Sequence, residues 1–162
     1  MKKLLIATAA AAFIAPAAIA QSGGAQITGV VDPVCEVSDL FANLGFASVT
    51  QGAQINDGFG VQCNDADGAV LTVISSEGGL ESDDNEDFAV PYTATVSGPS
   101  FNGSGSTPAQ PGPNDVTLVS DFNAFTTGLA AGEAHNLNIT LDATGLWAGG
   151  YSDTIFVQIT AQ

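Results

Sequence analysis

The residues that could do chemistry in this chain are one histidine, two cysteines and many carboxylates. Asp and Glu account for 17 of the 162 residues, Lys2 and Lys3 are the two basic residues, and His135 is the one histidine. Acyl or phosphoryl hydrolysis needs a nucleophile, a base and a group that stabilises developing negative charge. His135 stands apart from any such set, and no spacing selects two carboxylates as a glycosidase pair. We therefore predict a protein that is not an enzyme, with no catalytic residue and no cofactor.

Two acidic segments could offer oxygen ligands to calcium, which prefers carboxylate and carbonyl oxygens. They are residues 81–87 and the turn at residues 64–68. Neither matches the twelve-residue calcium loop, and the second lacks the closing glutamate. We interpret both as solvated turns between strands and predict no metal site, with weak calcium binding as the alternative. The acid excess as a whole is interpreted as serving solubility.

The beginning of the chain predicts export. Lys2 and Lys3 precede a mainly apolar run at residues 4–17, and Ala-Ile-Ala precedes Gln21. This is typical of a cleavable signal peptide at residues 1–20, while a retained membrane anchor is the alternative that the short run disfavours. Cleavage removes every side-chain cation, so we expect no nucleic-acid partner and no membrane insertion of the mature chain.

Export also bears on the two cysteines, Cys35 and Cys63. In an oxidising compartment they are expected to form a disulfide that closes a loop of about thirty residues and stabilises the fold by roughly 3 to 4 kcal/mol. A free thiol or a metal site is the alternative. Two cysteines and a distant histidine match no zinc spacing.

The elements that position these residues are predicted to be strands. Short runs rich in Val, Ile, Thr and Phe recur between clusters of Gly, Asn, Asp and Pro, and Leu137, Ile139 and Leu141 alternate with polar residues. The pattern predicts an all-β, immunoglobulin-like sandwich in one domain at residues 34–162, preceded by an extension at residues 21–33. Residues 97–114 have the composition of a long mobile surface loop. The predicted strands are 26–31, 34–38, 59–63, 69–75, 88–96, 116–119, 136–142 and 151–160, with 44–49 and 52–55 as weaker candidates.

The last predicted strand has one apolar face, which carries Tyr151, Ile155, Val157 and Ile159. An apolar strand at an edge needs a neighbour, because its unpaired backbone otherwise recruits other strands. Just before it, Trp147 and a Gly-Gly pair predict a packed aromatic followed by a tight turn, with a sugar-stacking platform as the alternative.

Three stretches carry a resemblance to a known family. The ending AGGYSDTIFVQIT resembles the Gly-x-Tyr-x-Asp-x-apolar-x-apolar ending of the spore coat protein U domain and of archaic chaperone-usher pilins. PVCEVSDLFANLGFASV is similar to that family's first cysteine strand, and FGVQCNDADGAVLTVIS to its second cysteine strand and hairpin. The stretch after Leu80 departs from the family in being more acidic.

The resemblance implies an exported structural subunit with an incomplete immunoglobulin-like fold. Such a subunit is held by a periplasmic chaperone, assembled with identical or related subunits at an outer-membrane usher, and displayed as a cell-surface pilus for adhesion or biofilm formation. Its fold is completed by donor-strand exchange, in which a segment of a neighbour adds a strand.

A suitable segment follows the signal peptide. In GGAQITGVVD, Ala25, Ile27, Gly29 and Val31 share one face and form the predicted donor strand. The predicted acceptor groove is lined by Tyr151, Ile155, Val157 and Ile159. The alternative is that the donor segment pairs within its own domain. The protein would then be a self-complemented, secreted monomer that binds a carbohydrate or a protein.

Overall fold

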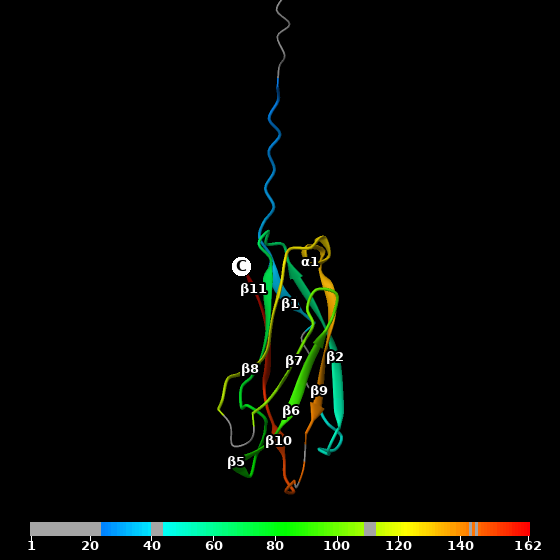
Figure 1. Cartoon of the computed structure of the whole chain (residues 1–162), viewed down its shortest axis with the longest axis vertical. Helices are drawn as coiled ribbons and strands as arrows, with labels where there is room; N and C mark the ends of the chain where they lie inside the picture. The colour runs from blue at the N-terminus through cyan, green and yellow to red at the C-terminus, as the bar shows by residue number, and fades with distance from the viewer. Residues whose placement is uncertain (1–23, 40–43, 109–112, 143, 145) are drawn as a thin grey trace, which may run out of the picture. The chain divides into compact units, whose positions relative to one another are not determined.

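A computed structural model describes residues 24–39, 44–108, 113–142, 144 and 146–162 (Figure 1). The predicted signal peptide lies outside the described residues. The chain separates into two units, residues 1–31 and Asp32–Gln162, and every described helix and strand belongs to the second. Within the described residues, no helix is long and apolar enough to span a membrane.

The second unit is an antiparallel all-β sandwich, as predicted (Figure 1). Its five-stranded sheet has the order β1-β2-β9-β6-β7, and a three-stranded sheet has the order β11-β3-β8. A second three-stranded sheet, β10-β4-β5, lies at one end of the domain. The bounds in the first sheet are β1 Cys35–Ser38, β2 Gln54–Cys63, β9 Glu133–Leu141, β6 Tyr92–Ser97 and β7 Gly103–Ser106. Those of the other elements are β11 Ile155–Ala161, β3 Ala69–Ser75, β8 Val116–Asn123, β10 Tyr151–Ser152, β4 Leu80–Ser82, β5 Asn85–Val90 and the helix α1 Thr127–Ala131.

The core forms where the inner faces of β2, β9 and β6 meet those of β3, β8 and β11. Side chains alternate between core and solvent along these strands, which is the burial expected of a sheet with one covered face. Fully burying each Val, Leu or Phe contributes roughly 1.5 to 3 kcal/mol. The core includes Phe59, Val61, Leu71, Val73, Val96, Phe101, Leu118, Leu129, Leu137, Ile139, Leu141 and Val157.

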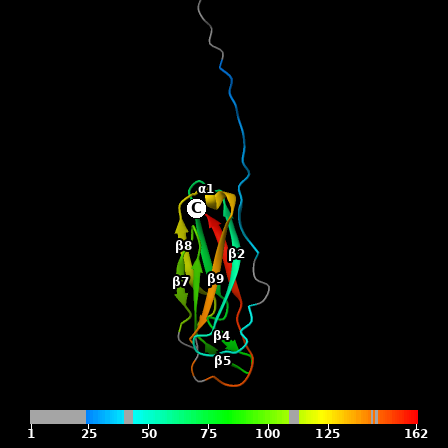
Figure 2. The same cartoon turned by 90° about the vertical axis from the view of Figure 1, so that its right-hand side faces the viewer.

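At one flank of the sandwich, glycine residues allow two strands of different sheets to pack closely. The strand β7 runs beside β8 along one edge of the domain (Figure 2). A Cβ at Gly105 would collide with the carbonyl of Leu118, and a Cβ at Gly103 would lie 2.7 Å from Cγ1 of Val119. Neither glycine position has room for a side chain. The backbone of β7 therefore packs directly against β8. We call this the closed flank, formed by β7 and β8.

The closed flank corrects the prediction of a long loop at residues 97–114. The segment contains β7, and the side chain of Phe101 is fully buried in the core. Gly103 and Gly105 are thus used for close packing against β8, while residues 109–112 lie outside the described residues.

Several predicted strand boundaries were also wrong. Residues 44–49 form no strand, and of the weak candidate at 52–55 only residues 54 and 55 belong to β2. Residues 26–31, the predicted donor strand, pair with no described strand within this single chain. The predicted strand 88–96 divides into β5 and β6 at Pro91, which has no N–H to donate to a ladder. The predicted strand 151–160 divides into β10 and β11. β4, β7 and α1 were not predicted from the sequence.

Candidate functional site

The flank opposite the closed one has two unpaired strand edges. The strand β1 pairs with Gly60–Cys63 of β2, so residues 54–59 of β2 have no described partner on that side. The strand β11 pairs with β3 and is the outer strand of its sheet. β1 and β11 contact each other without belonging to one sheet. We call β1, β11 and residues 54–59 the open flank.

The side chains of β11 divide into a core face and a solvent face. Val157 is 7 % exposed and Ile155 and Ile159 are half-buried, whereas Phe156 is 47 % exposed. The three aliphatic residues therefore lie on the core side, as the sequence predicted, and the outer two are incompletely covered.

The same residues direct their backbone groups toward the unpaired edge. The carbonyl of Thr154 accepts from the Ser76 N–H at 2.9 Å, and the Gln162 N–H donates to the Gly68 carbonyl at 3.2 Å. Hydrogen-bond direction alternates along a strand, and the register of β11 with β3 is unbroken. The even-numbered residues of β11 thus face β3, and the N–H and C=O groups of residues 155, 157 and 159 face away from it.

Tyr151, the fourth predicted groove residue, lies on a different strand. It is in β10, opposite Ser82 of β4. Its ring meets the edge of Phe88 at a centroid distance of 6.3 Å, and its hydroxyl donates to the Trp147 carbonyl at 2.8 Å. The structure therefore does not bring Tyr151 into one strand with Ile155, Val157 and Ile159.

The break between β10 and β11 is explained by Asp153, whose carboxylate accepts four hydrogen bonds. The donors are the hydroxyl of Ser75 at 2.6 Å, the hydroxyl of Tyr92 at 2.6 Å, the hydroxyl of Ser76 at 3.2 Å and the N–H of Glu77 at 3.1 Å. Burial, and secondarily the charge of Asp153, raise the pKa of Tyr92 far above its ordinary value. This carboxylate ties the beginning of β11 to β6 and to the end of β3. An acidic residue on the core-facing side of a predicted strand was the signal that could have identified it.

The disulfide prediction is confirmed. Cys35 and Cys63 are bonded and stand directly opposite each other on β1 and β2. Next to the bridge, Asn64 receives the Val34 N–H on its side-chain oxygen at 2.8 Å and donates its side-chain N–H to the Asp32 carbonyl at 2.8 Å. The bridge and this amide fix residues 32–35 at the end of β2.

The predicted donor residues precede that place and form no strand. Ile27 is 95 % exposed and Val31 is 83 % exposed, and Ala25 and Gly29 are also exposed. A Cβ at Gly29 would meet nothing within 4 Å. With Val30, which is 92 % exposed, the segment thus presents three large aliphatic side chains to solvent.

His135 has a structural environment. It is 3 % exposed and lies between the rings of Phe59 and Phe101, at centroid distances of 5.8 and 5.7 Å. The Phe101 N–H donates to its Nε2 at 3.2 Å. Burial lowers the pKa of His135, partly opposed by Glu133. Among the residues that the structure describes, no group of three or more His, Cys, Asp or Glu side chains could hold a metal ion.

Comparisons with known proteins identify no relative: no protein-family model, no curated protein and no solved structure matches this chain.

Proposed function

We propose that this chain is a structural subunit of an exported fibre, and that a strand from one copy completes the sandwich of the next. The chain follows the secretory route through the periplasm, served by a chaperone and an outer-membrane usher, and acts at the cell surface in adhesion or biofilm formation. The proposal extends the resemblance to spore coat protein U domains and chaperone-usher pilins.

One observation carries the proposal: the same chain has an exposed aliphatic segment and an aliphatic strand, β11, whose outer edge pairs with no described strand. Ile27 and Val31 are almost wholly exposed, while β11 is the edge strand of its sheet and leaves Ile155 and Ile159 half-covered. Exposed apolar segments and unpaired apolar edges are normally avoided, because both promote association.

Charge supports the same pairing. The protein has a formal net charge of −15, yet residues 24–31 and the whole of β11 contain no charged side chain. Two copies repel each other over most of their surfaces and least where these two segments meet.

The energetics of strand addition are favourable. A ladder of about six backbone hydrogen bonds would contribute roughly 1 kcal/mol each. Burying Ile27 and Val31 would contribute roughly 1.5 to 3 kcal/mol each. Gly29, between them on the same face, would place no side chain against β11.

The first test compares two substitutions in the donor segment. Ile27→Asp should abolish filaments in electron microscopy and ladders on gels of unheated samples, because an unpaired carboxylate would be buried. Val30→Asp is the matched control: Val30 is 92 % exposed but lies on the opposite face of the segment, so filaments should persist. Both variants should appear in the periplasm in wild-type amounts. Filaments from Ile27→Asp that equal those of the wild type would refute the proposal.

The second test removes the donor. A variant lacking residues 22–31 should persist only with its chaperone, and a synthetic peptide of that sequence should convert it into a stable monomer. If this variant is folded, soluble and monomeric by itself, then the sandwich is self-sufficient and the fibre proposal is wrong.

A further inference from the structure

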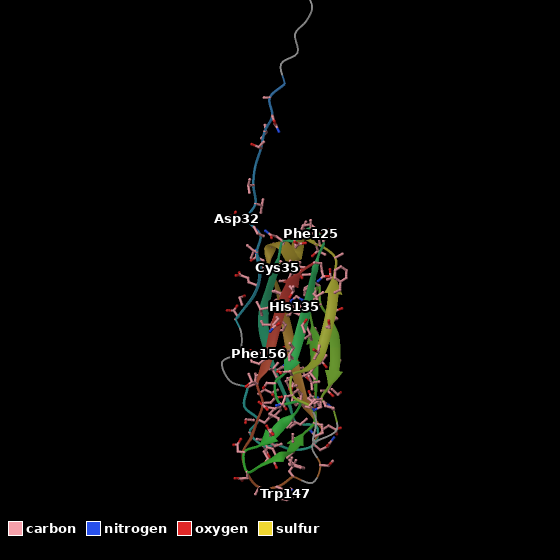
Figure 3. The ribbon with its side chains drawn as sticks, turned by 90° about the vertical axis from the view of Figure 1, so that its left-hand side faces the viewer. Asp32, Cys35, Phe125, His135, Trp147 and Phe156 are labelled. Carbon is pink, nitrogen blue, oxygen red and sulfur yellow. A yellow bond between two sulfur atoms is a disulfide. The ribbon has the colours of Figure 1, made fainter. Side chains whose placement is uncertain are left out.

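Trp147 is the chain's single tryptophan, and its side chain is 65 % exposed. It lies at the end of the domain opposite Cys35 and Phe125 (Figure 3). Tryptophan is enriched at binding surfaces, because one part of its ring can pack while another part stays in water. Neither the open flank nor the closed flank accounts for it.

Neighbouring side chains contact both the ring and the backbone of Trp147. The ring of Phe88 stacks against it at a centroid distance of 6.2 Å and an interplanar angle of 27°. The hydroxyl of Tyr151 accepts from the backbone N–H of Trp147 at 3.1 Å and donates to the backbone carbonyl of Trp147 at 2.8 Å, which fixes the main chain that carries the indole. Phe88 and Tyr151 also contact each other edge to face. The indole is thus supported on one side and mostly open to solvent.

Exposed hydrogen-bond acceptors lie beside this aromatic group. Asp83 and Asp84 form the turn between β4 and β5, and both are exposed. Their carboxylates lie against Gly149 and Gly150, where any side chain would collide with them. The Asp83 N–H donates to the Gly150 carbonyl at 3.0 Å, which fixes the turn against the segment that follows Trp147.

We propose that Trp147, with Asp83 and Asp84, forms a binding site for neutral pyranose glycans. The C–H face of a pyranose ring packs on an aromatic ring, and carboxylate oxygens accept hydrogen bonds from the sugar hydroxyls. A platform whose aromatic ring is already fixed loses little conformational freedom on binding.

The charge of the chain selects the class of glycan. Uronic acids, sialic acids and phosphorylated sugars need a cationic partner, and after residue 3 the sequence contains no Lys or Arg. The two carboxylates would repel an anionic sugar directly. This site does not depend on strand exchange, so the inference stands whether or not the chain forms fibres.

Tryptophan emission reports on binding at this site directly, because Trp147 is the chain's single tryptophan. The probes are cellohexaose and the hexamer of N-acetylglucosamine, with hexagalacturonate as the anionic comparison. We expect a saturable change in Trp147 emission with at least one neutral hexamer and none with hexagalacturonate.

Calorimetry then measures affinity in three variants. Trp147→Ala should weaken binding at least about tenfold, Trp147→Tyr should restore part of the loss, and Asp84→Ala should weaken binding several-fold. Phe122→Ala is the matched control, because Phe122 is 56 % exposed but belongs to β8, and it should bind as the wild type does. Thermal unfolding establishes that each variant is folded. The inference is overturned if neither neutral hexamer binds, if Trp147→Ala binds normally, or if hexagalacturonate binds as tightly.

Discussion

Asp153→Ala should destabilise the domain more than the loss of any other single carboxylate. It would remove the acceptor of the Ser75 and Tyr92 hydroxyls, whose side chains are 0 % and 1 % exposed. A hydrogen bond to a charged group contributes about 1.5 to 3 kcal/mol, and a buried donor left without a partner costs a similar amount. Because Asp153 itself is half-buried, the lower figure applies, and the bonds lost by these two buried hydroxyls, out of the four that Asp153 accepts, together give a destabilisation of about 3 kcal/mol.

Thermal unfolding followed by circular dichroism measures this loss. For a domain of this size a change of 1 kcal/mol moves the midpoint by roughly 3 to 4 °C, so Asp153→Ala should lower it by about 10 °C. Tyr92→Phe should lower it by about half as much, because it removes one donor and leaves no orphaned hydroxyl. The control is Asp67→Ala, which removes an exposed carboxylate in a turn and should change stability by less than about 0.5 kcal/mol.

The double variant decides whether the two residues act through one hydrogen bond. If they do, Asp153→Ala combined with Tyr92→Phe should be less destabilising than the sum of the single changes, by about 1 kcal/mol. A midpoint for Asp153→Ala within 2 °C of the wild type, on the same temperature scale, would refute the role assigned to this carboxylate. So would strict additivity in the double variant.

Three further predictions concern the disulfide, the closed flank and the buried histidine. Replacing Cys35 and Cys63 with serine should lower stability by about 3.5 kcal/mol in urea unfolding, and an intact mass unchanged by reductant would contradict the bridge. Gly105→Ala should destabilise by about 2 to 3 kcal/mol in the same assay, because its Cβ would collide with a backbone carbonyl, whereas Gly45→Ala, with nothing within 4 Å of its Cβ, should be neutral. Burial lowers the pKa of His135 below its ordinary 6.5, so at mildly acidic pH the unfolded chain binds more protons than the folded chain. The free energy of unfolding should therefore fall as pH drops below about 6.5. His135→Asn should remove the part of this fall that comes from the histidine. Equal pH profiles for His135→Asn and the wild type would contradict it.

The strands that the sequence predicted best are those whose pattern is local. β3 was predicted with its observed bounds, and β2, β9 and β11 were predicted in part, because alternating apolar residues report which face meets the core. β4 and β7 were missed, since the first is only three residues long, Leu-Glu-Ser, and the second is Gly-Ser-Gly-Ser. Neither contains two apolar residues at period two, and each is a strand because a neighbour pairs with it.

The candidate site, like the strands, was predicted only where its pattern is local. The apolar face of β11 and the disulfide follow from alternation and from cysteine count. The position of Tyr151 beside Phe88 does not follow from such patterns, and neither does the role of Asp153. Each depends on a residue more than sixty positions away in the chain.

The sequence by itself determined the class of the fold, the cysteine pair and the absence of cations after residue 3, since these follow from composition and period-two alternation. Only the tertiary structure decided which flank is closed. Gly103 and Gly105 have the composition of a loop, and only the position of β8 against them shows that they pack closely. Among the described residues, β11 has one edge without a partner strand, because β3 pairs with its other edge. Edges, close backbone approaches and buried carboxylate contacts are properties of pairs distant in the chain, and local patterns carry no information about such pairs.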